Sequence, residues 1–409
     1  MVANSGRARR WTSVALLGVA LAATPMLTAC GGGTDNGAKS GAAQSSQSQP
    51  SAERKAEPAV VLNPAKVATE PANGTDGVSP AGPFRVTVTD GTLTVVTLTN
   101  PDGKQIDGQL AADKLSWTAA GALGYDKTYT WAGTAIGKDS KEVPVAGSFH
   151  TLAPARKIGA EINVADNATY GIAMPISLTF SSPVKDKVAV QKALTVQTSV
   201  PTPGAWAWLS DTVAHWRPQN YWTPGTKVTV TAKIYGVPFG NGAYGLDDLA
   251  ANFAIGRSEI VRGNTQTHRL VVIKDGQQIF DFPASYGLDS DPGRVTHSGT
   301  HVVMEKAEIV SMSNLQYGYK DVKVPWGVRI DNFGEYIHGY EGSRAQQGNT
   351  NVSHGCANLA PENAKLFYDQ TLMGDPVEIT GTNIPFTLQD GDYSDWTLDW
   401  AAWTAKSAA

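Results

Sequence analysis

The sequence predicts a mainly β protein, with two tandem β-sandwich domains, a third β-rich domain carrying one main helix, and a tryptophan-rich C-terminal segment. Short runs rich in Thr and Val, which favour strands, alternate with turn residues along much of the chain. The 42 glycines and 23 prolines among 409 residues supply the many turns that short strands require. Helical spacing is clearest at residues 361–372, which begin with a proline.

The overall composition is that of a folded globular protein. Hydrophobic residues make up 41% of the chain and charged residues 17%, and the length allows several domains. The net charge is −4 and no periodic segment carries a basic stripe. This charge pattern argues against a nucleic-acid partner.

The first 58 residues are expected to lie outside the folded domains. Arginines at positions 7, 9 and 10 precede an apolar run at 14–23, which is too short to span a bilayer permanently. The run is followed by "LTAC", which resembles a bacterial lipobox, in which the cysteine is diacylated and becomes the new amino terminus. We therefore predict a lipoprotein signal peptide at 1–30 and a membrane anchor at Cys30, with a plain secretory peptide as the alternative. Residues 31–58 are small and polar and predict a flexible linker.

Residues 59–153 and 154–256 look like two copies of one immunoglobulin-like domain. Trp117 precedes Tyr129 by twelve residues and Trp216 precedes Val228 by twelve, so the copies are offset by 99 residues. In the first copy, "FRVTVTDGTLTVVTLTN" predicts two strands with a tight turn at Asp90 and Gly91 between them. These domains could bind carbohydrate or cell wall; we favour spacers, because neither copy gathers ionisable groups.

The third domain is expected at residues 257–381. A hairpin is predicted at Asp275-Gly276, one strand over "THSGTHVVMEKAEIVSMS", and two more strands around the turn at 332–334. The helix at 361–372 and the strand "GDPVEIT" complete the domain. In the extension at 382–409, tryptophans 396, 400 and 403 are spaced i, i+4, i+7, which favours a short helix packed on a neighbouring domain over a ligand site.

The chain has two cysteines, so lipidation of Cys30 would leave Cys356 without a disulfide partner. A thiol attacks as the thiolate and needs a nearby base, for which His301, His338 and His354 are candidates. His354 would share a face with Cys356 in an extended segment, but a turn at the intervening glycine would direct the two apart. His338 ends an apolar strand that could return beside the cysteine.

The run "IHGYEGSRAQQGNTNVSHGCANL" resembles the catalytic motif of the L,D-transpeptidases of the YkuD family, enzymes that cross-link peptidoglycan. "THSGTHVVM" and "GDPVEI" resemble further strands of that catalytic domain. The lipobox, the paired immunoglobulin-like domains and the tryptophan-rich tail resemble the multidomain actinobacterial members.

The resemblance assigns roles to the motif residues. It implies that Cys356 is the nucleophile and His338 the general base, held by the main-chain carbonyl of the residue that follows, here Gly339 where many relatives have serine. The N–H groups of Cys356 and of His354 and Gly355 before it would form the oxyanion hole. On the same resemblance, Ser353 and Asn358 brace the loop, although His354 fits a structural role equally well.

Five residues are assigned to substrate binding on the same basis. Tyr319 and Met304 match flap positions, Phe333 and Gly334 match the strand edge that binds the donor peptide, and Asn358 faces the substrate. No cofactor and no metal ion is implied, and the Cys and His spacing of metal sites is absent.

The resemblance implies transfer of an acyl group from a donor tetrapeptide stem, with release of D-Ala. The acceptor would be the side-chain amine of a diamino acid on another stem, which joins third residues. It also implies acylation by carbapenems and a lipid-anchored position outside the cytoplasmic membrane, facing the cell wall. The alternatives are a carboxypeptidase, a ligase that attaches protein to the wall, and a wall-binding spacer with a decayed active site.

Overall fold

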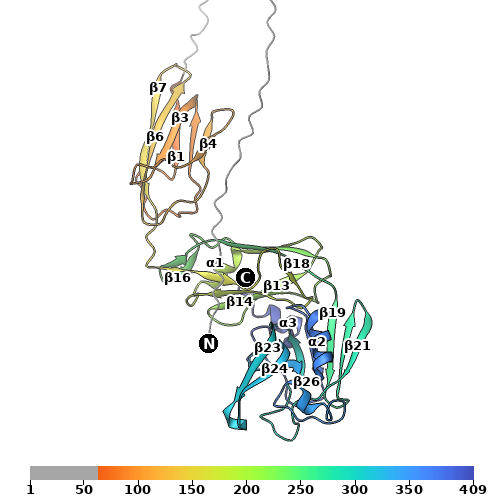
Figure 1. Ribbon diagram of the computed structural model, residues 1–409. Coiled ribbons are helices and arrows are strands. Elements are labelled where there is room, and N and C mark those ends of the chain that lie inside the picture. Colours follow the sequence, from red (N-terminus) through yellow and green to blue (C-terminus); the bar gives the residue numbers. More distant parts are fainter. Residues whose placement is uncertain (1–62) are drawn as a thin grey trace, which may run out of the picture. The chain divides into compact units, whose positions relative to one another are not determined.

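The computed structural model describes residues 63–409 and shows a mainly β protein (Figure 1). The predicted signal peptide, its lipidation site Cys30 and the linker lie outside the described residues. In the part that is described, no helix is both long and apolar enough to cross a membrane.

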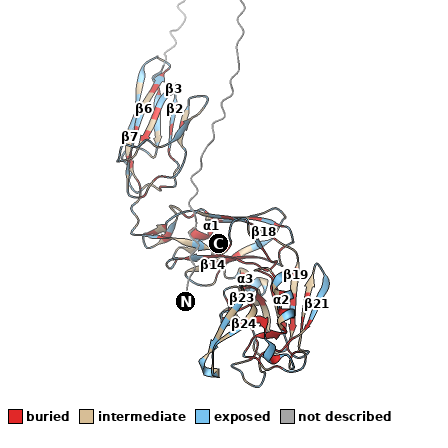
Figure 2. Ribbon diagram, in the orientation of Figure 1, coloured by how far each residue is buried: buried red, intermediate tan, exposed pale blue. Residues whose placement is uncertain are grey.

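The first sandwich consists of two sheets with strand orders β1-β2-β5-β4 and β3-β6-β7. Along β2 every second residue is buried, as expected for a strand with one face on a core (Figure 2). Its strands are β1 (Lys66–Glu70), β2 (Arg85–Thr89), β3 (Gly91–Thr99), β4 (Gly108–Leu110), β5 (Ser116–Ala119), β6 (Thr128–Gly137) and β7 (Glu142–His150).

The two strands expected around Asp90 form, but they do not pair with one another. Asp90 has a φ of 58°, and β2 and β3 on either side of it belong to different sheets. The turn therefore carries the chain across the sandwich. The short-range turn signal is the same for a hairpin and for this crossing, and only the sheet partners distinguish them.

The second sandwich has sheets β10-β18-β15-β12 and β13-β14-β11-β9, with a small sheet β16-β17-β8. Its elements are β8 (Arg156–Ile158), β9 (Ala160–Ile162), β10 (Thr169–Tyr170), β11 (Ile176–Phe180), α1 (Lys187–Lys192), β12 (Leu194–Thr198), β13 (Gly204–Trp208), β14 (Val213–Pro218), β15 (Lys227–Ala232), β16 (Pro238–Gly240), β17 (Ala243–Gly245) and β18 (Leu249–Ile255).

Corresponding tryptophans of the two sandwiches are packed in the same way. Trp117 and Trp216 are both buried, and each ring covers a glycine of a neighbouring strand. A Cβ atom at Gly108 would lie 1.9 Å from the ring of the first, and one at Gly204 would lie 2.0 Å from the ring of the second. This shared packing supports the interpretation of the two segments as copies.

The third domain contains a five-stranded sheet, β21-β20-β19-β27-β22, and a four-stranded sheet, β23-β24-β25-β26. Its elements are β19 (Glu259–Asn264), β20 (Arg269–Lys274), β21 (Gln277–Pro283), β22 (Gly299–Val302), β23 (Glu305–Asn314), η1 (Leu315–Tyr317), β24 (Tyr319–Arg329), β25 (Tyr336–Gly339), η2 (Glu341–Ser343), β26 (Ala357–Leu359), α2 (Pro361–Gln370) and β27 (Pro376–Thr380).

Most of the expected local structure of this domain is confirmed. β20 and β21 form the hairpin at Asp275-Gly276, β24 and β25 pair antiparallel, and the predicted helix is α2, whose Ala364 and Phe367 are buried in the core. The single strand expected over 296–313 is wrong. It is two strands, because the chain leaves one sheet after β22 and enters the other at β23.

The tryptophan-rich extension packs on the second sandwich. It contains η3 (Asp395–Thr397) and α3 (Trp400–Thr404). The indole N–H of Trp403 donates to the oxygen of Ala205 at 3.0 Å, and that of Trp396 to the oxygen of Ala173 at 2.8 Å. The predicted packing of a short terminal helix on a neighbouring domain is therefore confirmed.

Candidate active site

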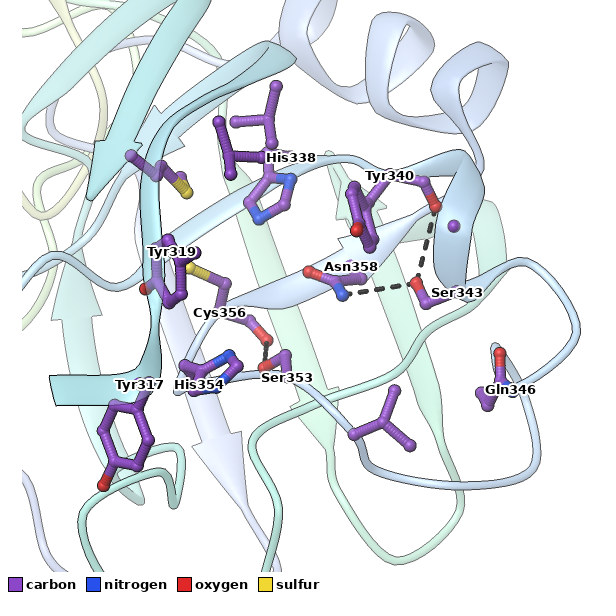
Figure 3. A pocket seen from close by; sticks show the side chains of 15 residues that line it. Tyr317, Tyr319, His338, Tyr340, Ser343, Gln346, Ser353, His354, Cys356 and Asn358 are labelled. Carbon is purple, nitrogen blue, oxygen red and sulfur yellow. Dashed lines mark hydrogen bonds between the residues drawn. The ribbon is translucent and has the colours of Figure 1, made fainter. Parts of the chain in front are cut away.

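Two neighbouring parallel strands bring the cysteine and the histidine to one face of a sheet. His338 of β25 lies opposite Asn358 of β26, and Cys356 directly precedes β26. Alternate residues of a strand share a face, so Cys356 points to the same side as Asn358. Figure 3 shows the thiol and the imidazole lining one pocket.

The pocket has a volume of about 420 Å³. Its walls come from the β23–β24 hairpin, from the turn after β25 and from the loop that carries the cysteine. It is lined by Met312, Tyr317, Tyr319, Val322, Val324, His338, Tyr340, Gly342, Ser343, Gln346, Val352, Ser353, His354, Cys356 and Asn358. This lining contains no carboxylate, ammonium or guanidinium group, so a ligand is recognised there by hydrogen bonds and apolar contact.

The imidazole of His338 is held in one tautomer by the main chain. Its Nδ1 lies 3.0 Å from the oxygen of Gly339, so Nδ1–H donates and Nε2 is left as the basic nitrogen. Burial lowers the pKa of His338 to about 4, against the opposing effect of this hydrogen bond. The expected main-chain contact therefore forms with glycine in the following position.

The thiol of Cys356 is 8% exposed and donates to the oxygen of Gly334 at a sulfur–oxygen distance of 3.6 Å. Burial raises the pKa of Cys356 to about 12, although the main-chain N–H of Tyr336 favours the thiolate. The structure shows no hydrogen bond between this sulfur and the ring of His338. Both shifts favour a neutral thiol and a neutral imidazole in the resting pair.

The loop before the nucleophile is fixed by Ser353. Its Oγ donates to the oxygen of Cys356 at 2.6 Å and accepts from the N–H of Gly355 at 3.2 Å. Gly355 has a φ of 113°, and its carbonyl accepts from the hydroxyl of Thr296 at 2.7 Å. The N–H of Gly355 is therefore engaged inside the loop, which differs from the expectation of three free oxyanion donors.

Asn358 is braced through its amide nitrogen, while its Oδ1 is buried without a hydrogen-bond partner among the described residues. Its Nδ2 donates to Oγ of Ser343 at 3.2 Å, and Oγ of Ser343 also accepts from Nε2 of Gln347. Sequence reasoning missed Ser343 and its neighbour Gln346 in the pocket wall. Both lie in the stretch between the histidine and the SHGC motif, where spacing alone gives no signal.

Two tyrosines at the tip of the β23–β24 hairpin, which is the flap of this domain, pack against His354. The ring of Tyr319 lies 5.1 Å from the imidazole and that of Tyr317 lies 4.9 Å from it. Tyr319 lines the pocket as expected, whereas Tyr317 was not predicted. Met304 lies between β22 and β23 outside the pocket lining, and the methionine that lines the pocket is Met312.

Phe333 and Gly334 occupy the turn before β25. Phe333 is 67% exposed, lies outside the pocket lining, and stacks on the ring of His297. Gly334 contributes the carbonyl that faces the thiol. His301 is buried on β22, bonded through Nε2 to the oxygen of His297, and does not line the pocket.

Arg294 supports the cysteine loop from behind. Its Nε donates to the oxygen of Ser353 at 3.1 Å, and the guanidinium also donates to the oxygen of Val352. Nothing in the local sequence around this arginine indicates the role.

Comparison with known proteins agrees with this geometry. Residues 258–379 match the L,D-transpeptidase catalytic domain, and residues 75–238 match the bacterial Ig domain. The chain is 46% identical over 342 residues to L,D-transpeptidase 5 of Mycobacterium tuberculosis (strain ATCC 25618 / H37Rv), covering 83% of this chain and 76% of that protein. It is 33% identical over 352 residues to L,D-transpeptidase 2 of Mycobacterium tuberculosis (strain CDC 1551 / Oshkosh), covering 84% and 85%.

Among solved structures, the chain is similar to the L,D-transpeptidase LdtMt1 in complex with imipenem, with 31% identity and a TM-score of 0.47 over 56% of this chain and 100% of that one. The fold and the thiol–imidazole pocket define a cysteine acyltransferase. The chain belongs to the L,D-transpeptidase family.

Proposed function

We propose that this protein cross-links peptidoglycan by joining the third residues of two stem peptides. The observation that carries the proposal is the pocket in which the thiol of Cys356 and the free Nε2 of His338 face the same space. A buried, neutral pair suits a reaction in which the proton moves only when the acyl donor has entered.

The first half of the reaction forms a thioester. The proton of the thiol passes to Nε2 of His338, the sulfur attacks the carbonyl that precedes the terminal D-Ala of a tetrapeptide stem, and the C–N bond breaks. The proton then leaves with the amine of D-Ala. In the second half, the side-chain amine of a diamino acid on another stem attacks the thioester, gives a proton to Nε2, and displaces the sulfur, which takes the proton back.

An exposed edge next to the pocket suits an extended peptide. The carbonyl of Gly334 accepts from the thiol, Phe333 before it is exposed, and Tyr317 and Tyr319 line the pocket itself. We place the donor peptide along this edge and the acyl group beneath the flap. The lipidation at Cys30, a membrane anchor and a location facing the cell wall belong to the same proposal and rest on the N-terminal sequence.

Carbapenems are expected to acylate the same sulfur, because a strained β-lactam carbonyl is attacked as the peptide carbonyl is. Imipenem, a carbapenem, is present in the solved LdtMt1 structure named above.

Two measurements test the proposal. Intact-mass analysis after incubation with meropenem should show one adduct on the native protein and none on Cys356→Ser; an adduct that survives the substitution contradicts it. Incubation with purified disaccharide-tetrapeptides should then give a dimer linked between third residues. Release of D-Ala without dimer would establish a carboxypeptidase instead, and no turnover would leave the spacer interpretation.

A further inference from the structure

A second group of ionisable side chains lies beside the pocket and takes no part in the proposed reaction. It consists of His297, Asp331 and Glu335, each of which offers one ligand atom within 4.8 Å of the other two. Asp331 and Glu335 flank the turn between β24 and β25, and His297 precedes β22 of the other sheet. The three groups thus connect the two sheets of the domain.

Each carboxylate uses one oxygen for hydrogen bonds and keeps the other free. Oδ1 of Asp331 accepts from the N–H groups of Gly334 at 2.9 Å and Glu335 at 2.7 Å. Oε1 of Glu335 accepts from the main-chain N–H of His297 at 3.2 Å and from its imidazole Nδ1 at 2.8 Å.

The remaining oxygens, Oδ2 of Asp331 and Oε2 of Glu335, are buried and have no hydrogen-bond partner among residues 63–409. Asp331 is fully buried and Glu335 is 4% exposed. An unpartnered buried carboxylate oxygen is costly unless a proton or a cation is close to it. Burial raises the pKa of both carboxyl groups, and the imidazole of His297 opposes this rise.

We infer that His297, Asp331 and Glu335 form a binding site for one divalent transition-metal ion of the zinc type. One oxygen from each carboxylate and one imidazole nitrogen are three ligands of the kind that Zn²⁺ takes in proteins, and water completes the tetrahedron. Zinc–ligand distances of about 2.0–2.2 Å require the side chains to draw together slightly. The imidazole disfavours Mg²⁺ and Ca²⁺, which prefer oxygen ligands alone.

The site has a route to solvent on one side. The side chain of His297 is 23% exposed, and the ring that stacks on it, Phe333, is itself mostly exposed on the turn. An ion can therefore enter past His297 without unfolding the sheet.

The ion would act on the active site indirectly. A Cβ atom at Gly355 would lie 3.3 Å from Cγ and Oε1 of Glu335, so this side chain packs against the loop before the nucleophile. Asp331 in turn holds the N–H of Gly334, whose carbonyl accepts from the thiol. Bound metal would fix this turn and stabilise the fold, and it would supply no chemistry to the acyl transfer.

Zinc retention tests the inference directly. The Cys356→Ala protein is used, because the catalytic thiol and His338 could otherwise bind zinc themselves. After loading with Zn²⁺ and dialysis, elemental analysis should find one zinc per chain, and Asp331→Asn or Glu335→Gln in the same background should bind zinc at least about tenfold more weakly. The matched control is His150→Gln, because this histidine also contacts two aspartates but lies on the surface of the first sandwich.

A thermal-shift measurement covers the case in which a buried carboxylate variant does not fold. Zn²⁺ should raise the melting temperature of the Cys356→Ala protein, Mg²⁺ should not, and the rise should disappear in His297→Gln, a milder substitution because the side chain of His297 is partly exposed. Absence of retained zinc overturns the inference. So does zinc binding that His297→Gln leaves unchanged, or stabilisation by Mg²⁺ equal to that by Zn²⁺.

Discussion

Nδ1 of His338 lies 3.0 Å from the main-chain oxygen of Gly339. The acceptor that orients this imidazole, the proposed general base, is thus a group that every residue type carries. This explains how the site tolerates glycine where the resemblance to relatives suggested serine. Residue 339 therefore matters in two separate ways. Its carbonyl orients the ring of His338, and its lack of a side chain leaves space for the neighbouring residues.

Gly339→Ala should lower stability without removing the orienting bond. A Cβ atom there would lie 3.0 Å from Cα of Pro361 and 3.1 Å from Cγ of Pro325, both tighter than ordinary contact. Overpacking of this kind costs about 1–3 kcal/mol of unfolding free energy. Chemical denaturation should show that loss, while meropenem acylation of the folded protein keeps its rate. His338→Ala is the contrasting variant, and loss of a general base should slow acylation by about 10²–10⁴-fold. Equal losses of acylation rate in both variants would contradict the main-chain assignment.

The free thiol should be unreactive at neutral pH. Burial raises the pKa of Cys356 to about 12 and lowers that of His338 to about 4, so both charged forms are disfavoured between these values. The thiolate fraction should then rise about tenfold for each pH unit, without a plateau. Alkylation by iodoacetamide from pH 6 to pH 9, followed by intact mass, measures this. A plateau that begins below pH 7 would show a preformed thiolate–imidazolium pair instead.

Gly355→Ala should reduce both stability and the rate of catalysis. The φ of 113° is rarely adopted by residues with a side chain, and a Cβ atom would also press on Glu335 at 3.3 Å. Strain of this kind costs about 1–3 kcal/mol, and a loop displaced by about 1 Å can lose about 10²-fold in rate. Meropenem acylation and chemical denaturation measure the two effects.

Gly276→Ala is the matched control, because its φ of 81° is also positive while nothing lies within 4 Å of its Cβ position. It should lose a similar amount of stability and keep its acylation rate. If both variants acylate normally, the conformation of Gly355 is not required for the reaction.

The sequence predicted the pieces whose signals are local. Turn residues and spacing within a few positions predicted the hairpin at Asp275-Gly276 and helix α2. They also predicted the packing of the tryptophan-rich extension on a neighbouring domain. The sequence did not predict which distant segments pair with one another in the sheets. Asp90 shows this in the first sandwich, because the same turn signal serves a hairpin or a crossing between sheets.

The same distinction between local signals and distant contacts applies to the residues of the site. Cys356 and His338 were found because the motif fixes their spacing, and their adjacency follows from parallel pairing of β25 and β26. Met304 was assigned to the flap by resemblance to the family, but the chain changes sheet at that point and Met312 lines the pocket. Ser343 and Arg294 act through contacts that depend on loop geometry, for which the sequence holds no periodic signal.

The terminal extension should depend on one buried pair. Nδ1 of His215, on β14, lies 3.0 Å and 3.1 Å from the two carboxylate oxygens of Asp395, and the side chains are 3% and 0% exposed. Asp395→Ala leaves the buried imidazole without its acceptor, which costs about 1–3 kcal/mol. The guanidinium of Arg217, stacked on Trp396 and Trp403, then holds the tail with one anchor fewer. Chemical denaturation should show the loss of stability.

Limited proteolysis should show where that loss falls. In Asp395→Ala the peptide bonds after residue 381 should be cut faster than in the native protein, because the tail detaches from the second sandwich before the domains unfold. Asp392→Ala is the matched control: its carboxylate bonds Asn332 on the exposed surface, where such contacts contribute little. If the two variants are cut at the same rate, then the tryptophan packing alone holds the extension, and the buried pair contributes nothing measurable to its docking.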